Sequence, residues 1–163
     1  MGKGAIFAVV ILIAIVAVVA FIAYPMFFGD NKAVKLQPDV DAFPAGWKVD
    51  QSASASWSEG TTNKDWMSRE RFVDAGETEH VVVQIYVFTT VEKANASYNG
   101  LKTSFGGGGS AWVPTGADIG FKSLQNDFYF QKGTVVVQIL TSVPSTLTQT
   151  QIDSIATNII GKI

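Results

Sequence analysis

The sequence predicts an α+β protein: one N-terminal transmembrane helix, then an antiparallel sheet of about five strands with two helices on one face. Three observations predict this class. Residues 5–28 form a run of twenty-four residues without a charge or a strongly polar side chain. After residue 28, stretches rich in β-branched and aromatic residues alternate with polar turns. Two later stretches change to the 3.6-residue apolar period of a helix.

The apolar run at residues 5–28 is long enough to cross a bilayer. At about 1.5 Å rise per residue it spans roughly 36 Å as a helix, against a hydrocarbon core of ~30 Å. We expect a transmembrane anchor at residues 1–28, a linker at 29–42 and an extracytoplasmic α+β domain at 43–163. The domain is placed outside because it is rich in Ser, Thr, Asn and Gln and poor in Lys and Arg.

Two other interpretations of the N-terminus stay open. Val18-Val19-Ala20 could serve as a signal-peptidase site, although the apolar run exceeds the 7–15 residues typical of a cleavable signal. The start Met1-Gly2-Lys3-Gly4-Ala5 resembles the class III signal of type IV pilin-like proteins, which implies cleavage between Gly4 and Ala5. That family has Glu at the fifth position of the mature helix, where this chain has Val9.

Composition excludes several classes of function. Lys3 is the one charged residue of the first 28, so the rest of the chain has 11 Lys and Arg against 14 Asp and Glu, a net charge of −3. This balance is unlike the basic surface of a nucleic-acid-binding domain. The absence of cysteine excludes disulfides, thiolate metal sites and cysteine nucleophiles.

The expected strands follow from β-branched and aromatic content between turn residues. The last two are joined by the short turn Gln131-Lys132-Gly133, and the glycine run Gly106–Ser110 is expected to be a mobile loop, natural rather than engineered. Residues 111–123 are expected to be irregular. The strands are expected at residues 47–57, 65–74, 80–88, 124–130 and 134–142.

Two helices are expected from apolar stripes and capping boxes. Thr89 with Glu92, and Thr148 with Gln151, have the spacing of a capping box, and Gly106 ends the first helix. The stripes consist of Val91, Ala94, Tyr98, Leu101 and Phe105 in the first helix and Ile152, Ile155, Ile159 and Ile163 in the second.

An internal repeat supports this order of elements. Val81–Ile85 reads VVVQI, and the same five residues recur at Val135–Ile139. Each copy is expected to be the second strand of a hairpin and to lead into an amphipathic helix. The chain therefore reads as two strand–strand–helix units after an extra first strand, with both helices covering one face of the sheet.

Short motifs of the domain resemble a known family. Phe43–Trp47, Asp118–Gly120 and Phe128–Gly133 before a valine-rich strand are similar to small membrane-anchored prokaryotic domains with the PsbP-like α+β fold. The resemblance covers about residues 43–163. It implies a fold and an extracytoplasmic location, and it transfers no catalytic residues.

Candidate chemistry is sparse. His80 is the only histidine, and it has no second histidine or cysteine with which to form a metal site or triad. Asp74, Glu77 and Glu79 could hold a hard cation, but they lack the spacing of a calcium loop, so a solvated turn is favoured. We find no nucleophile–base pair and no cofactor loop, and therefore expect neither an enzyme nor a bound cofactor or metal.

The remaining candidates concern interaction and modification. Trp47, Trp57, Trp66 and Trp112 could form an interaction surface, although packing in the core is favoured. Asn95-Ala96-Ser97 matches the N-glycosylation sequon. We expect a single-pass protein of the cell membrane, whose extracytoplasmic domain binds protein partners as an accessory subunit of a membrane or surface complex. The alternative is a pilin-like filament subunit cut after Gly4.

Overall fold

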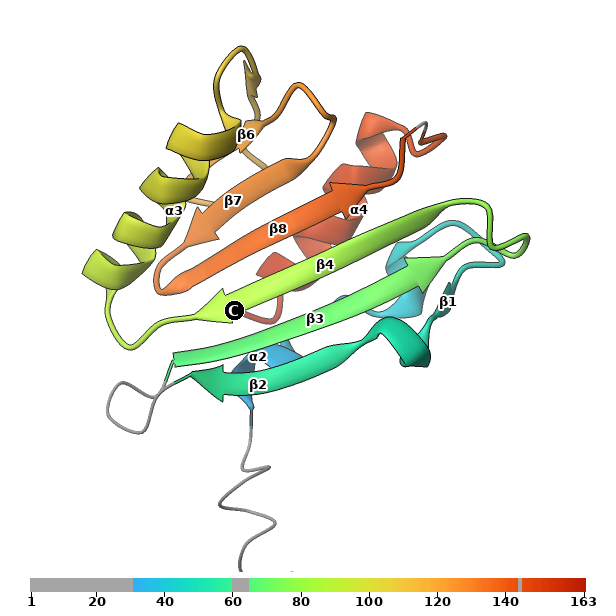
Figure 1. Cartoon of the computed structure of the whole chain (residues 1–163), viewed down its shortest axis with the longest axis horizontal. Helices are drawn as coiled ribbons and strands as arrows, with labels where there is room; N and C mark the ends of the chain where they lie inside the picture. Colours follow the sequence, from blue (N-terminus) through green and yellow to red (C-terminus); the bar gives the residue numbers. More distant parts are fainter. Residues whose placement is uncertain (1–30, 60–64, 144) are drawn as a thin grey trace, which may run out of the picture. The chain divides into compact units, whose positions relative to one another are not determined.

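The computed structural model describes residues 31–59, 65–143 and 145–163, with the backbone alone at 56–59. These residues belong to one compact unit, Asn31–Ile163. Seven strands follow one another in the order β1-β3-β4-β8-β7-β6-β5, and an eighth, β2, also pairs with β3; every pair is antiparallel (Figure 1). The strands are β1 (Lys48–Val49), β2 (Ala55–Glu59), β3 (Asp65–Val73), β4 (His80–Val87), β5 (Ser110–Ala111), β6 (Ile119–Lys122), β7 (Phe128–Lys132) and β8 (Val135–Thr141).

Three α-helices and two 3₁₀ turns accompany the sheet. The helices are α2 (Lys32–Lys35), α3 (Val91–Phe105) and α4 (Gln149–Ile160), and the turns are η1 (Val40–Ala42) and η2 (Gln51–Ala53). Within the described residues, no helix combines the length and apolar character needed to cross a bilayer. The expected transmembrane helix falls on residues outside this part of the chain.

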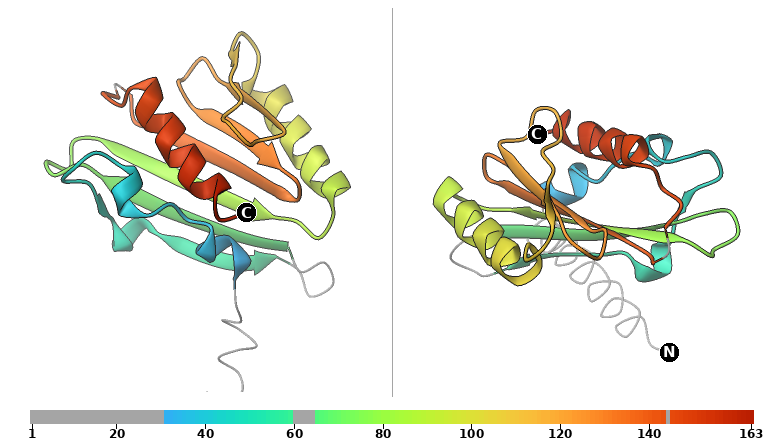
Figure 2. Two further views of the ribbon diagram at one scale, coloured as in Figure 1. Left: turned by 180° about the vertical axis from the view of Figure 1, so that it is seen from behind. Right: turned by 90° about the horizontal axis from the view of Figure 1, so that it is seen from above.

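The long helices α3 and α4 lie on opposite faces of the sheet (Figure 2). The larger core, on the α4 side, joins Ile152, Ile155 and Ile159 to alternate residues of β3, β4, β7 and β8 and to Ala33 of α2. The smaller core, on the α3 side, consists of Ala94, Tyr98, Phe121, Tyr129 and Val136. The expected fold class is therefore wrong on two counts: the sheet has eight strands instead of about five, and its helices cover both faces.

The physical reason for two-sided cover is visible in the central strands. Residues 81–83 and 135–137 are valine, and residues 128–130 are all aromatic, so both faces of β4, β7 and β8 present apolar side chains. Continuous apolar runs of this kind are typical of strands buried on both faces, whereas alternation is typical of strands covered on one.

The strand expected at residues 47–57 is interrupted. Asp50 accepts a hydrogen bond from the Ser52 N–H at 3.1 Å and from its hydroxyl at 2.6 Å, which forms η2 and separates β1 from β2. Residues 111–123, expected to be irregular, contain the end of β5 and all of β6. Strands of two and four residues are too short for a periodic signal and exist through their pairing with neighbouring strands.

The glycine run after α3 forms a defined turn. Gly106 is the C-cap of α3, and Gly108 has a positive φ of 76°. A Cβ on Gly109 would lie 2.2 Å from the carbonyl oxygen of Lys122. Only glycine permits this approach of the chain to β6.

The capping predictions have mixed outcomes. Thr148 and Gln151 form the expected capping box of α4. In α3 the N-cap is Thr90, whose hydroxyl accepts from the Lys93 N–H at 3.3 Å, so the box expected at Thr89 and Glu92 is wrong by one position. The Thr89 N–H instead donates to the Asp65 carboxylate at the start of β3, at 2.9 Å.

The stretch expected to be a linker belongs in part to the folded unit. Asn31 caps α2 through a 3.0 Å bond from the Ala33 N–H, and Ala33 is fully buried in the α4-side core. Lys162 follows α4 and donates to the Gln37 carbonyl oxygen at 2.6 Å, while Asn158 on α4 donates to Asp39 at 3.1 Å. Hydrogen bonds therefore connect the first residues of the folded unit to its last helix and C-terminal residues.

Candidate functional site

A pocket opens where the edge of the sheet is interrupted. β1 pairs with the end of β3 and β2 with its beginning, which leaves η2 opposite the middle of β3. Across this break the Asp50 N–H donates to the Arg71 carbonyl oxygen at 2.7 Å, and the Arg71 N–H donates to the Ser54 hydroxyl at 3.3 Å. The backbone N–H and carbonyl of Arg71 in β3 thus keep hydrogen-bond partners across the break.

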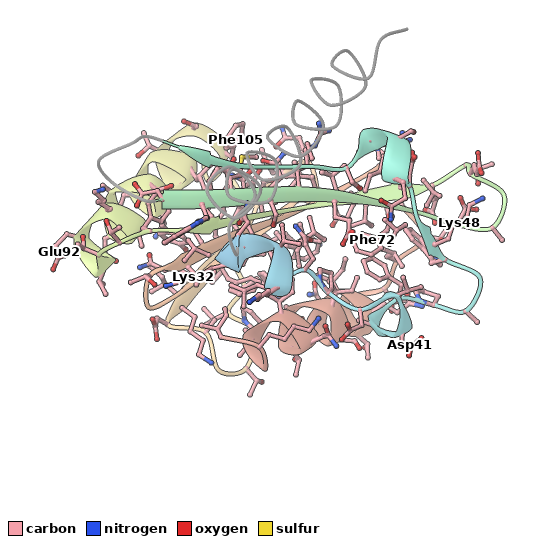
Figure 3. The ribbon with its side chains drawn as sticks, turned by 90° about the horizontal axis from the view of Figure 1, so that it is seen from below. Lys32, Asp41, Lys48, Phe72, Glu92 and Phe105 are labelled. Carbon is pink, nitrogen blue, oxygen red and sulfur yellow. The ribbon has the colours of Figure 1, made fainter. Side chains whose placement is uncertain are left out.

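The pocket has a volume of about 260 Å³ and lies between α2 and this interrupted edge. Figure 3 shows α2, beside the labelled Lys32, on the same side of the sheet as α4. The lining residues come from α2 and its C-terminal turn, from η2 and β2, and from β3; they are Val34, Gln37, Gln51, Ser54, Ala55, Ser68, Arg69 and Glu70.

Gln37 and Ser68 form a buried polar network in the wall of the pocket. Their side chains are 8% and 2% exposed. Gln37 Nε2 donates to Ser68 Oγ at 2.7 Å and to the Val83 carbonyl oxygen at 3.3 Å, and Ser68 Oγ donates to the Ala33 carbonyl oxygen at 2.8 Å. Because the Val83 carbonyl oxygen can only accept a hydrogen bond, the side-chain amide of Gln37 must turn its nitrogen toward β4.

The other end of the Gln37 amide has no donor. Gln37 Oε1 is buried and accepts no hydrogen bond from any residue that the structure describes. A buried acceptor left unpaired costs about 1–3 kcal/mol, and native proteins contain few of them. Such an atom beside a pocket indicates a place where a ligand or water could donate.

Glu70 provides a second acceptor. Alternation along β3 places it on the same face as Ser68, where it is half-buried. Among the described residues, no ion pair or hydrogen bond involves its carboxylate. Burial raises the pKa of Glu70, and the positive charge of Lys162 acts in the opposite direction. Lys162 is itself held by Asp39 at 3.0 Å and by the Gln37 carbonyl oxygen.

The hydroxyl of Ser68 is engaged in the hydrogen bonds of the pocket wall. Ser68 donates to a backbone carbonyl and accepts from Gln37, so its hydroxyl has no base to activate it. His80, at the start of β4, is aligned with Val73 of β3 and lies on the α3 side of the sheet. The pocket presents the amide of Gln37 and the carboxylate of Glu70 in its lining.

Three of the four tryptophans are packed in the part of the chain that the structure describes, and their role as an interaction surface stays a prediction. Trp47 is 9% exposed and stacks on Phe43 with ring centroids 5.5 Å apart. Trp112 packs edge-on against Phe128 and donates to Asp153 at 2.8 Å. Trp66 lies 4.9 Å from the Lys32 ammonium, and the side chain of Trp57 is outside the described residues. All three rings belong to the α4-side core or pack against it.

The acidic turn after β3 is organised by its own hydrogen bonds. Asp74 accepts from the Glu79 N–H at 2.8 Å, from the Gly76 N–H and from the Thr78 hydroxyl; the Glu79 bond contributes most to lowering the Asp74 pKa. Glu77 pairs with Lys48 at 2.6 Å, and Glu79 accepts from Thr146. No group of three or more His, Cys, Asp or Glu in the described ranges is placed to hold a metal ion.

The two modification sites have different positions. Asn95 is exposed on α3, and its side-chain oxygen accepts from Gln131 Nε2 at 2.7 Å. Its glycosylation stays a prediction. Gly4 and Ala5, the expected processing site, lie outside the described residues.

Comparison of the chain with family models, curated proteins and solved structures finds no match. The resemblance to PsbP-like domains and the pilin-like interpretation therefore stay predictions, and the site rests on its own geometry.

The pocket residues Gln37, Ser68 and Glu70 were not identified from the sequence. Gln37 falls in the expected linker, where nothing indicated burial. A signal was present in β3, whose residues 68–71 are all polar although the strand lies between two others. Polar residues on both faces of an inner strand indicate partners or a site on each face.

Proposed function

We propose that this protein is a membrane-anchored binding protein, held at a bilayer by the apolar run at residues 5–28. Its folded unit acts outside the cytoplasm as an accessory subunit of a membrane or surface complex. The observation that carries the proposal is the run of twenty-four uncharged residues that directly precedes the folded unit in the sequence. The first helix of that unit, α2, contributes to the wall of a polar pocket. An apolar run of this length is typical of an anchor.

The pocket supports recognition of a partner at the edge of the sheet. β2 forms hydrogen bonds with β3, and η2 keeps the pocket open beside it. Interrupted sheet edges are places where a partner can approach both backbone and side-chain groups. A partner seated there would contact Gln51 and Ala55, both of which are exposed.

The orientation can be tested with a single introduced cysteine. The natural chain has no cysteine, so Ser104→Cys on the exposed side of α3 gives one reactive thiol without background. We expect a membrane-impermeant maleimide to label the full-length variant in intact cells. Labelling that occurs only after permeabilisation would place the domain in the cytoplasm and contradict the proposal.

The contact surface can be tested by crosslinking from two positions. A photoreactive amino acid at Gln51, on the pocket rim, is expected to give a discrete crosslinked product in native membranes. The same amino acid at Asn99, which is exposed on α3, is the matched control and is expected to give none. Equal crosslinking from both positions would exclude the pocket edge as the specific surface.

The filament alternative is favoured by one observation, the sequence Lys3-Gly4-Ala5 before the apolar run. The intact mass of the protein from its native membrane separates the two proposals. A chain that keeps Met1, or lacks only Met1, supports the anchored subunit. A chain that begins at Ala5 supports a pilin-like subunit, and sedimentable polymers would then be expected.

A further inference from the structure

We propose that the pocket between α2 and β3 binds a primary ammonium group, with the Glu70 carboxylate as the outer acceptor and Gln37 Oε1 as the inner one. This inference rests on the proposed binding function and adds the chemical class of the ligand. It starts from two residues that line the same pocket of about 260 Å³, Gln37 and Glu70, whose Oε1 atom and carboxylate accept no hydrogen bond from any residue that the structure describes.

Glu70 lines the pocket, and its carboxylate has no ion-pair or hydrogen-bond partner among the residues that the structure describes. Arg69 also lines the pocket, but it is exposed and alternates with Ser68 and Glu70 along β3. Lys162 is already bound by Asp39 and by the Gln37 carbonyl oxygen. A cation entering the pocket would therefore find the Glu70 carboxylate without an ion-pair partner among the described residues.

The arrangement of the acceptors favours an N–H donor. Both hydrogens of Gln37 Nε2 are directed to Ser68 and the Val83 carbonyl, so the amide can offer a ligand only its oxygen. A ligand that donates to this oxygen removes the penalty of an unpaired buried acceptor. Oε1 is buried, so a donor reaches it only if the groups that cover it move.

An ammonium group fits better than the other common cation. It is compact and carries three donors, so it can bond Glu70 and Gln37 together and keep one donor for water. A guanidinium group is planar and wider, and it prefers two parallel acceptors of one carboxylate. The ammonium could come from a free amine or from a lysine side chain of a bound protein, and the experiment separates these sources.

The test is a titration of the ¹⁵N-labelled full chain in detergent micelles, followed through the amide signals of Gln37, Ser68 and Glu70. The probe is n-butylammonium, and 1-butanol, tetramethylammonium and n-butylguanidinium are the comparison compounds. We expect saturable shifts with n-butylammonium at millimolar concentration, and no saturable shift with the alcohol or the quaternary ion. Equal or tighter binding of any comparison compound would overturn the proposal.

Two variants assign the effect to the pocket. Glu70→Gln keeps the shape of the side chain and removes its charge, and it is expected to weaken n-butylammonium binding at least tenfold. Glu92→Gln removes an exposed carboxylate on α3 and is expected to leave binding unchanged. Binding that is unaffected by Glu70→Gln in a correctly folded protein would overturn the inference.

A second ligand separates the two sources of the ammonium. N-acetyl-lysine amide that binds as tightly as n-butylammonium would indicate a lysine of a protein partner, whereas binding of n-butylammonium alone would indicate a free amine. The proposed ligand and the proposed anchored function can therefore fail independently, because different experiments test them. The titration reports on the pocket, while thiol labelling and intact mass report on the anchor and its orientation.

Discussion

The two copies of the VVVQI sequence lie side by side in the sheet, yet their helices lie on opposite faces. The first copy lies in β4 and the second in the neighbouring antiparallel strand β8, and the two overlap so that Val83 pairs with Ile139 and Gln84 with Gln138. α3 follows the first copy and α4 follows the second. α3 buries Ala94 and Tyr98, whereas α4 buries five residues, Ile152, Ile155, Ala156, Ile159 and Ile160.

The two helices bury different numbers of residues because the two faces of the repeated strands differ in composition. Toward α4, both copies present only β-branched side chains, and these are 0–3% exposed. Toward α3, each copy presents one valine and one glutamine, and Gln84 accepts from the Tyr86 hydroxyl at 3.0 Å. The uniformly apolar face receives the more apolar helix. A repeated sequence therefore specifies the order of elements, while the composition of each face decides where a helix packs.

The largest expected effect compares the two helix interfaces directly. Ile155→Ala on α4 removes a fully buried side chain and is expected to lower the free energy of unfolding by about 2–5 kcal/mol. Leu101→Ala on α3 removes a half-buried one and is expected to cost roughly 1 kcal/mol. Denaturant unfolding of the two full-length variants measures both. Equal losses would show that the two helices contribute alike and would contradict the comparison.

A smaller effect is expected at the helix N-caps. Thr148→Ala removes the capping box of α4 and Thr90→Ala the single cap of α3, and each is expected to cost about 1 kcal/mol. Thr157→Ala, at an exposed position inside α4, is the control and is expected to cost nothing measurable. Thermal unfolding followed by circular dichroism checks all three. A larger loss in Thr157→Ala than in either cap variant would refute the assignment of the caps.

The smallest expected effect is a pH dependence of stability that comes from Tyr129 in the α3-side core. Tyr129 is 2% exposed and stacks on Phe121 with centroids 4.6 Å apart; burial and then the charge of Asp127 raise its pKa to about 12. The folded state keeps this proton while the unfolded state loses it at about pH 10. Stability from Tyr129 is therefore present below about pH 10 and is lost as pH rises toward 12.

This pH dependence is measured against a variant without the hydroxyl. Between pH 9 and about pH 10.5, the free energy of unfolding of the natural protein is expected to fall by roughly 0.5–1 kcal/mol more than that of Tyr129→Phe. Ultraviolet absorbance should show one tyrosine titrating near pH 12. An identical decline in both proteins would rule out a perturbed Tyr129.

Much of the candidate site could not be predicted because it depends on residues distant in sequence. Gln37 and Ser68 are 31 positions apart, and their hydrogen bond forms only because α2 packs on β3. A helix of four residues has no periodic signal. In contrast, strand β4 and the capping box of α4 depend on neighbouring residues, and both lie where the sequence predicts them.

The sequence by itself determined the class of each long element, the order of the two hairpin–helix units and the cap of α4, because propensity, periodicity and capping act within a few residues of the chain. Tertiary structure decided which face each helix covers, the break between β1 and β2, the pairing of the short strands and the position of Gln37 beside Glu70. These features depend on which surfaces meet, and a contact between distant residues has no local signature.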